Sequence, residues 1–480
     1  MKTVKHHQQP HPRKSHNKTK KSHTISCFQG KPVRPFLGRG QVLQENQQGW
    51  KVVSIQGTPH ERGFAHGYLL YQELKNVVKK FPFIVRNELY VSYKKYLSIC
   101  QRTIEPIVKS HYPEFYQELQ GIADGSTYAG YPITIHVLVA WNAFMSMYEY
   151  INNPPNRTKT QHGGTEQTRP GHCSAFIATG KATKDGKIVM AHTTHSDLVS
   201  GSLFNIILKI IPEHGHTFCM QTAPGCIASG TDWFISDTGI IGCETTIGGA
   251  TYRPTFGEGN DPYFCRIRQA MQYGNTLDDY AHIMTTKNAG DYPGSWLFGN
   301  TKTQEIMLCE IGLNIKNIQR TKNGIFYGMN SAMSQELRSK ETDDEDFYDL
   351  ATSSGARNAR LHELLYKTYY GKIDTENSQK ILADHYNVIK QQDHMPSSKT
   401  ICVHTYHDSD SNYPNYPHGC LDGKVVDSNM ASNMTFMGRW GPACGTPFHA
   451  KKFIHDNPKY HAWESVLPDF PRKDWTRLDL

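Results

Sequence analysis

The chain has 480 residues, of which 38% are hydrophobic, so a sizeable core is possible in one large domain or in two to three ordinary ones. The formal net charge is +8, but ten of the 52 lysines and arginines lie in the first forty residues, and the first acidic residue is Glu45. The remaining 42 basic residues face 44 acidic ones, so the body is nearly neutral. This distribution argues against a nucleic-acid-binding body and assigns the basicity to an N-terminal tail.

Residues 1–45 are predicted to form a disordered basic tail, because they contain prolines, histidines and lysines but no sustained apolar run. Such a tail could make a weak contact with a polyanion or a membrane surface. It lacks the hydrophobic region of a secretory signal, and no stretch of about 18 apolar residues could span a bilayer. We therefore expect no transmembrane segment and a cytoplasmic or other reducing compartment.

The eleven cysteines are an odd number and form no CxxC pairs. Their scatter argues against a disulfide scaffold and against a zinc ribbon, and it favours mostly free thiols. The sequence therefore predicts neither a metal site nor another cofactor.

The region before residue 150 is predicted to be mainly helical, after a first strand at residues 50–55. Thr58 precedes Pro59, and Glu61 follows three residues later, which is the pattern of a capping box with proline at the first helical position. Apolar residues then recur at helical spacing as far as residue 150, with a short turn near Pro132.

The stretch beginning at Cys173 organises the rest of the chain. It follows a polar loop at residues 153–170 and starts a strand at residues 173–179. A tight turn at residues 184–187 then leads to a second apolar run at residues 188–192. This pattern predicts an antiparallel hairpin with a cysteine at its first position.

Strand and helix patterns beyond this hairpin are segregated and do not alternate, and no repeats are evident. Further strands are predicted at residues 203–211, 233–236, 240–246, 295–298, 305–310, 315–320, 325–327, 400–404 and 423–427. Helices are predicted at residues 262–273, from 276 onward, at 356–369 and at 374–385. This order disfavours parallel βαβ units and predicts an α+β fold with two antiparallel sheets and helices outside.

Cys173 has the position that an N-terminal nucleophile needs, because a chain break before it would free its α-amine. An amine with a pKa of about 8 can take the thiol proton, directly or through water. The alternative is that Cys173 is a small buried hydrophobic residue, as single cysteines often are.

Several motifs in the chain together resemble those of a known group of hydrolases. They are Gly57-Thr58-Pro59 with Glu61, Gly63 and His66-Gly67; His172-Cys173-Ser174-Ala175; Glu244-Thr245-Thr246-Ile247-Gly248; Tyr292 with Trp296-Leu297; Glu310-Ile311-Gly312-Leu313; Gly355-Ala356-Arg357; and Asp422-Gly423-Lys424-Val425. The chain is similar, over roughly residues 48 to 450, to the phospholipase B-like proteins and the acyl-CoA:isopenicillin N acyltransferase-related peptidases, which are N-terminal nucleophile (Ntn) hydrolases.

This resemblance implies a four-layer αββα sandwich with two antiparallel sheets. It also implies self-cleavage between His172 and Cys173. The mostly helical pro-segment, residues 46–172, would then stay associated with a catalytic part formed by residues 173–480.

Two histidines follow the nucleophile in the hairpin. His192 lies nineteen residues after Cys173 and, from the resemblance, is expected near the nucleophile, where it could orient the α-amine or move a proton; otherwise it is a core histidine. His195 departs from the family pattern and could touch substrate or simply be exposed. A metal site made by this pair is disfavoured, because strand positions three apart face opposite sides.

Further site residues are expected after the second hairpin. One of Thr245 and Thr246 should face the pocket and donate to the oxyanion, unless the pair merely reflects β-propensity. The family's asparagine is absent from its expected place near Tyr292, so Asn330 is the substitute that we consider. Arg357 could bind a carboxylate or phosphate, or form a salt bridge, and Trp296 is expected to contact substrate.

The sequence thus predicts a self-processing hydrolase with an N-terminal cysteine that cleaves acyl ester or amide bonds. A phospholipase B-like lipid acyl hydrolase is the first expectation. The alternatives are an amidohydrolase or acyltransferase acting on small N-acyl compounds and, from another class, a non-catalytic binding protein with the same fold. The expected partner is a small-molecule or lipid acyl substrate, with no specific nucleic acid.

Overall fold

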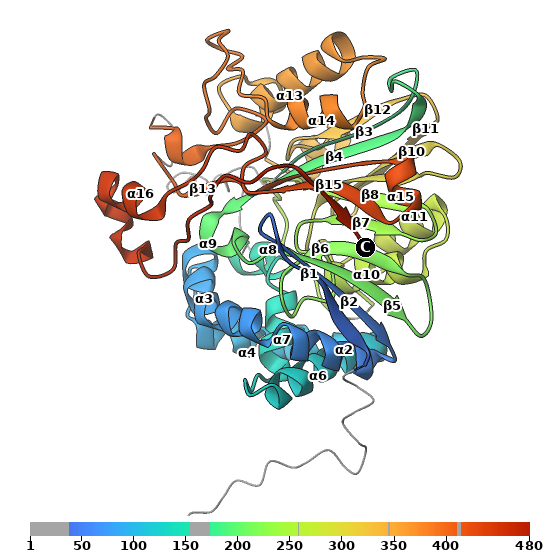
Figure 1. The fold of residues 1–480 in the computed structure, drawn as a ribbon, viewed down its shortest axis with the longest axis vertical. Helices are drawn as coiled ribbons and strands as arrows, with labels where there is room; N and C mark the ends of the chain where they lie inside the picture. Colours follow the sequence, from blue (N-terminus) through green and yellow to red (C-terminus); the bar gives the residue numbers. More distant parts are fainter. Residues whose placement is uncertain (1–37, 154–172, 258, 344–345, 410–413) are drawn as a thin grey trace, which may run out of the picture.

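The computed structural model describes residues 38–480, apart from residues 154–172, 258, 344–345 and 410–413. Its strands form two sheets (Figure 1). The larger sheet has nine strands in the order β1 (Gly40–Gln47), β2 (Trp50–Gly57), β5 (Ile206–Pro212), β6 (Phe218–Thr222), β7 (Trp233–Ser236), β8 (Ile240–Thr246), β9 (Gly294–Asn300), β10 (Glu305–Ile311) and β11 (Lys316–Thr321).

The smaller sheet contains the predicted cysteine hairpin. Its order is β12 (Gly324–Gly328), β3 (Cys173–Gly180), β4 (Gly186–Asp197), β14 (Asp422–Asp427), β15 (Thr435–Trp440) and β16 (Thr476–Asp479), with β13 (His418–Cys420) paired to β4. Neighbouring strands in both sheets are antiparallel, except that β2 and β5 are parallel. The prediction of two mainly antiparallel sheets is confirmed.

The helices fall into an N-terminal group and a group distributed among the later strands. The first group is α2 (Pro59–Leu69), α3 (Tyr71–Leu89), α4 (Tyr93–Thr103), α5 (Glu105–His111), α6 (Pro113–Tyr128), α7 (Ile135–Asn142) and α8 (Met147–Asn152). The later helices are α9 (Leu198–Gly201), α10 (Tyr263–Tyr273), α11 (Leu277–Thr285), α12 (Gln335–Glu341), α13 (Ser353–Glu363), α14 (Thr375–Leu382), α15 (Ser428–Ser432) and α16 (Ala450–Asp456).

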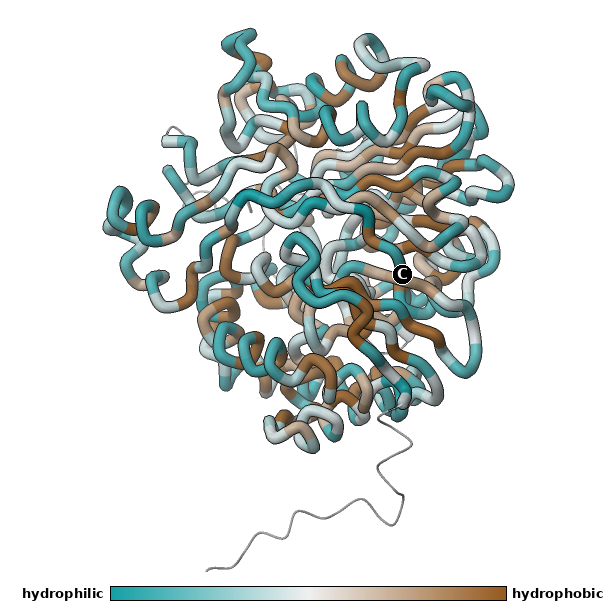
Figure 2. The backbone as a smooth tube through the Cα atoms, in the orientation of Figure 1, coloured by the Kyte–Doolittle hydropathy of each residue, from teal (hydrophilic) through white to brown (hydrophobic). Residues whose placement is uncertain are grey.

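Alternate residues of β3 face two different cores. Ala175 and Ile177 belong to the large core shared with the nine-stranded sheet, and β3 contacts β8 and β9. Phe176 and Ala178 belong to a second core that includes residues of α13 and α14. Hydrophobic residues accordingly gather on the strands in Figure 2. The smaller sheet therefore packs on the larger sheet with one face and under helices with the other.

Helices also contact the larger sheet, because α11 packs on β9 and β10 and is itself packed against α10. These contacts make a mixed fold of helices around two sheets. The complete four-layer αββα sandwich remains a prediction.

The first helix forms as the sequence predicts. Thr58 accepts from the backbone N–H of Glu61, and the Glu61 carboxylate accepts from the backbone N–H of Thr58, so the capping box is complete. The α2 backbone then crosses α6 closely: a Cβ atom on Gly63 would lie 2.0 Å from the carbonyl oxygen of Glu118. Glycine is required there, because any larger residue would force the two helices apart.

Two sequence predictions differ from the structure. Strand β1 begins at Gly40, inside the expected tail, and it pairs with β2; residues 1–37 lie outside the described part. Residues 400–404 do not form the predicted strand, although Ile401, Cys402 and Val403 make a short apolar run. The backbone N–H of Cys402 donates to Asp384 and that of His404 donates to Ser397, so this segment folds as a loop.

Candidate active site at the start of strand β3

Cys173 is the first residue of β3 and lies opposite Thr194 of β4, while Ala175 lies opposite His192. Directly opposed residues on antiparallel strands project to the same face. This face is the one that packs on the larger sheet, because the Nε2 atom of His192 lies 2.9 Å from the carbonyl oxygen of Glu244 on β8. The hairpin therefore places Cys173, Thr194 and His192 between the two sheets.

Asn330 and Arg357 fix the backbone of Cys173 from both sides. The backbone N–H of Cys173 donates to Oδ1 of Asn330 at 3.1 Å, and Arg357 Nη1 donates to the Cys173 carbonyl at 2.6 Å. Arg357 Nη2 also donates to Asn330 Oδ1, at 3.0 Å. Asn330 and Arg357, which the sequence analysis considered as site residues, thus both contact Cys173, the expected nucleophile.

Asn330 has a special backbone conformation that explains its orientation. Its φ is 75°, in the left-handed region that asparagine tolerates better than most residues. Its side-chain amide donates to the Thr246 carbonyl at 2.9 Å, and its own carbonyl accepts from the backbone N–H of Gly248. These bonds to the end of β8 hold Oδ1 toward Cys173.

Arg357 carries a buried charge whose partners are all neutral. Besides Cys173 and Asn330, its guanidinium donates to Ser174 and Ser353, and no carboxylate among the described residues pairs with it. Burial lowers the pKa of Arg357 to about 10, so the group remains charged at neutral pH. An unpaired buried cation is costly, and an anion that forms at Cys173 would compensate it.

The surroundings of Cys173 favour the protonated thiol. Burial raises its pKa well above the usual range, and the nearby acids Glu244 and Asp232 raise it further. A proton acceptor is therefore required before this thiol can act as a nucleophile.

His192 is a neutral imidazole at ordinary pH. Burial lowers its pKa well below the usual range, and the charge of Lys424 adds to this effect. Its Nδ1 atom is buried without a hydrogen-bonding partner among the described residues. His192 lies on the same face as Cys173, but Thr194, and not His192, stands directly opposite the cysteine.

A buried lysine that the sequence analysis did not assign lies beside these residues. Lys424 on β14 is opposite His192, and its Nζ atom donates to Thr194 Oγ1 at 2.9 Å and to Gln221 Oε1 at 2.7 Å. The Nζ atom of Lys424 also forms an ion pair with the Asp422 carboxylate, with Nζ 3.1 Å from Oδ1. The signal was present in the Asp422-Gly423-Lys424-Val425 motif, but two charged residues alternating with apolar ones could equally mark an exposed strand face.

The two threonines at the end of β8 face opposite sides. Thr246 Oγ1 lies 2.8 Å from the Tyr292 hydroxyl, whereas Thr245 Oγ1 is buried and has no hydrogen-bonding partner among the described residues. A Cβ atom on Gly328, which pairs with Ala175 of β3, would lie 2.2 Å from Thr245 Oγ1. Thr245 is therefore the threonine that faces the cysteine hairpin.

Two buried carboxyl groups form a cluster that sequence reasoning did not identify. Asp232 accepts from the hydroxyls of Tyr292 at 2.7 Å and Tyr263 at 3.0 Å, and Tyr292 also lies 3.3 Å from Glu244. Burial raises the pKa of Asp232 to about 6, and burial together with the charge of Asp232 raises that of Glu244 well above its usual range. The pair therefore retains a proton near neutral pH.

The remaining expected residues have other surroundings. His195 is fully buried on β4, opposite Cys420, so it is not exposed. Trp296 is buried with its ring stacked on Phe298, at 5.4 Å, and no described contact joins it to Cys173. His172 lies outside the described residues.

A surface depression of about 630 Å³ lies elsewhere, over β11 and β12, and its lining includes Arg320, Phe326 and Tyr370. It contains none of the residues around Cys173. In the described part of the chain, no helix is long and apolar enough to cross a membrane.

Comparisons with known proteins give distant relatives. No family model matches the chain. An uncharacterized protein of Archaeoglobus fulgidus is 26% identical over 279 residues, which are 56% of this chain and 43% of that protein. Protein dcd1A of Dictyostelium discoideum is 30% identical over 92 residues, 16% of this chain and 21% of that protein. The chain thus spans less than half the length of these curated relatives.

Among solved structures, the chain is similar to a mutant form of a conjugated bile acid hydrolase from Clostridium perfringens. The likeness covers 56% of this chain and 89% of that one, with a TM-score of 0.33 and 7% sequence identity. A likeness this distant assigns no activity to the chain.

Proposed function

We propose that this protein is a self-processing Ntn-type hydrolase whose nucleophile is Cys173. The main support is the environment of Cys173, a buried cysteine at the start of a strand. Asn330 accepts from its backbone N–H, and Arg357 donates to its carbonyl. Structural cysteines need only apolar packing, whereas an N-terminal nucleophile needs its amine fixed and an adjacent positive charge.

In the proposed processing step, Cys173 Sγ attacks the carbonyl carbon of His172. The His172–Cys173 C–N bond breaks, and the backbone nitrogen takes the thiol proton and leaves as the free α-amine while a thioester forms. Water then hydrolyses the thioester, which restores the thiol and leaves a carboxylate on His172. The new amine would occupy the place where the Cys173 N–H now donates to Asn330.

In catalysis, the α-amine takes the thiol proton that the buried site otherwise retains. Sγ attacks the acyl carbonyl, the leaving amine or alcohol takes the proton, and water hydrolyses the acyl-thioester. Thr245 Oγ1 is the side-chain donor that we assign to the oxyanion, and the Arg357 charge stabilises the anionic sulfur.

The substrate that we propose first is a lipid acyl ester, from the resemblance to phospholipase B-like proteins. Small N-acyl amides, cleaved or transferred by the same thioester route, are the alternative. A non-catalytic binding protein on this fold would have no need of cleavage before Cys173.

The decisive experiment is intact-mass analysis of the purified full chain, with sequencing of any fragment. We expect a fragment that begins Cys-Ser-Ala-Phe, and an uncut chain in Cys173→Ala. The matched control is Cys226→Ala, another buried cysteine, which should process normally. Turnover of a chromogenic acyl ester and an acyl amide then separates the two substrate classes.

Two results would reject the proposal. An active preparation that contains only uncut chain would exclude self-processing. A fully processed protein that turns over neither substrate, although it binds one of them, would favour the binding protein.

A further inference from the structure

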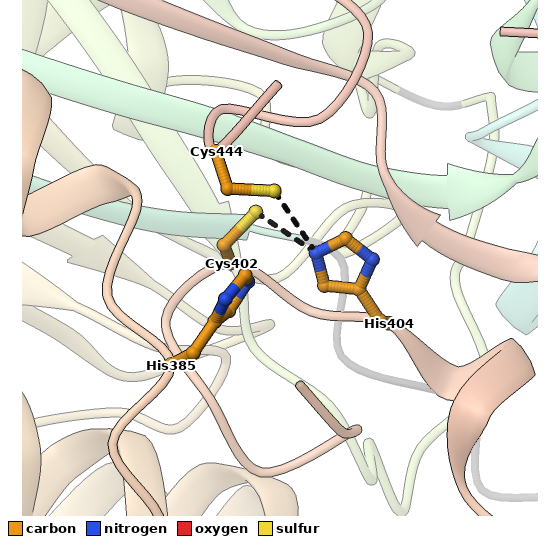
Figure 3. A group of neighbouring side chains, drawn as sticks. All are labelled: His385, Cys402, His404 and Cys444. Carbon is orange, nitrogen blue, oxygen red and sulfur yellow. Dashed lines mark hydrogen bonds between the residues drawn. The ribbon is translucent and has the colours of Figure 1, made fainter. Parts of the chain in front are cut away.

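Four side chains of metal-binding types converge at a place that the proposed reaction does not use. They are His385, Cys402, His404 and Cys444, and they point toward one another in Figure 3. Each offers one nitrogen or sulfur atom, and these four atoms all lie within 4.8 Å of one another. The sulfurs of Cys402 and Cys444 lie 3.3 Å and 3.4 Å from Nε2 of His404.

The four residues come from three segments that are distant in the sequence. His385 follows α14, Cys402 and His404 lie in the loop before the short helix η4 (Thr405–His407), and Cys444 follows β15. Only one pair is close in sequence, so the cluster has none of the spacings that identify zinc ribbons. This explains why the sequence predicted no metal.

We propose that these four residues bind one structural Zn²⁺ ion. Ligand atoms about 2.0–2.3 Å from a tetrahedral zinc lie roughly 3.3–3.8 Å apart, and the two sulfur–nitrogen separations fall in that range. Two thiolates with two imidazoles are a set that selects zinc over the harder divalent ions. The protein fills all four positions, which is typical of a structural ion and leaves no place for substrate.

The surroundings orient the ligands as a metal site requires. The Nδ1 atom of His404 lies 2.6 Å from the Tyr406 hydroxyl, which turns Nε2 toward the two sulfurs. The Cys444 sulfur accepts from the backbone N–H of Thr446 at 3.3 Å, a contact that favours a thiolate. Nε2 of His385 is buried but makes no hydrogen bond of normal geometry within the described residues. A metal ion would satisfy that atom.

A neighbouring cysteine has a different role. Cys420 lies on β13, and its sulfur is 2.8 Å from Thr193 Oγ1 and accepts from the backbone N–H of Ala443. It is therefore engaged with the sheet and stands outside the group of four.

The position of the site suggests what the ion would stabilise. The loop that carries Cys402 and His404 contacts the sheet where the carbonyl of Val403 accepts from the backbone N–H of Cys420 on β13. Strand β13 pairs in turn with β4, the strand of His192. Zinc would tie this loop, which contacts β13 beside the end of β4, to the segment after β15.

The test is the metal content of the full chain, purified without chelator. We expect about one zinc per chain by elemental mass spectrometry. Cys402→Ser, Cys444→Ser and His404→Gln should each lose most of it. The controls Cys226→Ser and His407→Gln, the latter beside the cluster, should retain it.

Wild-type protein provides a second readout if a variant fails to fold. Removal of zinc by a chelator should lower the melting temperature and expose two further reactive thiols. Refilling with Co²⁺ should give the d–d and thiolate charge-transfer bands of a tetrahedral S₂N₂ site.

Three outcomes would overturn the zinc site. The first is wild-type protein that contains no zinc and takes up neither Zn²⁺ nor Co²⁺. The second is a mass lower by two hydrogens with a mapped Cys402–Cys444 disulfide. The third is a folded Cys402→Ser/Cys444→Ser double variant that retains its zinc. None of them depends on whether Cys173 is processed, so this proposal and the proposed hydrolase activity can fail separately.

Discussion

Arg357 is a fully buried charge that bonds to neutral groups, and two of those groups belong to Cys173 and Asn330. Lysine keeps the charge but has no planar fork, so it cannot bond both residues in the same way. We expect Arg357→Lys to lower kcat of the processed protein by about 10²-fold or more. The measurement is kcat on a chromogenic acyl substrate after mass spectrometry confirms processing.

Arg360 is the matched control, because it lies three residues later on the same helix and pairs with Asp384 and Glu363. Arg360→Lys should keep kcat within about twofold, since partly exposed ion pairs contribute little. Equal losses in both variants would show that α13 merely needs its arginines for packing.

Thr245 and Thr246 provide a second test at the residue scale. If the free hydroxyl of Thr245 donates to the oxyanion, Thr245→Val should lower kcat by roughly 10²–10³-fold with little change in stability. Thr246→Val instead removes the contact with the Tyr292 hydroxyl, so we expect a lower melting temperature and a smaller change in kcat. A reversed order would assign the donor to Thr246, and equal losses in kcat would indicate strand packing.

At the scale of elements, helix α2 is joined to the loop after β6 through a buried histidine. Nε2 of His66 accepts from the backbone N–H of Gly225 at 2.8 Å. Burial lowers the pKa of His66 from 6.5 to about 4, so the His66 imidazole stays neutral in the folded protein between these two pH values. The unfolded chain binds the proton below pH 6.5, and stability is therefore lost as the pH falls toward 4.

His66→Gln keeps an acceptor in the same helix but cannot be protonated. Between pH 7 and pH 4, we expect the free energy of unfolding of the wild type to fall by about 3 kcal/mol more than that of His66→Gln. Urea unfolding at several pH values measures the difference. His282→Gln, at an exposed position of α11, should leave the wild-type profile unchanged. A wild-type profile in His66→Gln would mean that other groups cause the acid sensitivity.

At the scale of the whole molecule, the segment before Cys173 is built into the fold. Strand β2 pairs in parallel with β5, and Glu118 of α6 is the buried partner of Arg62 and Arg268. Burial tends to raise the pKa of Glu118, but the charges of Arg268 and Arg62 outweigh it and keep that pKa below the usual value. Cleavage before Cys173 would leave Glu118 and Arg268 on different fragments.

We therefore expect the processed fragments to elute as one particle in size-exclusion chromatography, even at 1 M salt, where the Debye length is about 3 Å. Separation of the fragments without denaturant would contradict this. Glu118→Ala leaves the buried guanidinium of Arg268 without a carboxylate partner among the described residues, while Arg62 keeps Glu114, and it should cost about 3–5 kcal/mol of stability. Glu376→Ala, which breaks an exposed pair with Lys380, should leave the stability nearly unchanged.

The sequence by itself determined the features that depend on neighbouring residues. The capping box at Thr58, the cysteine hairpin and most strands of the larger sheet follow from hydrogen bonds and alternation within a few residues. The same local reasoning failed at residues 400–404, where a short apolar run folds as a loop because its backbone N–H groups donate to Asp384 and Ser397 and not to a neighbouring strand. It also could not detect β1, since the polar residues of an edge strand resemble those of a tail.

Only the tertiary structure decided how the two sites are assembled. Cys173 meets Asn330 and Arg357 across 157 and 184 residues of sequence, and Lys424 reaches Thr194 across 230. The resemblance led us to consider Asn330 and Arg357 as site residues. No spacing in the chain could place them beside Cys173, because side-chain contacts between sheets depend on strand order and register. The group of His385, Cys402, His404 and Cys444 has the same origin, because these residues become neighbours only when three loops of the folded chain meet.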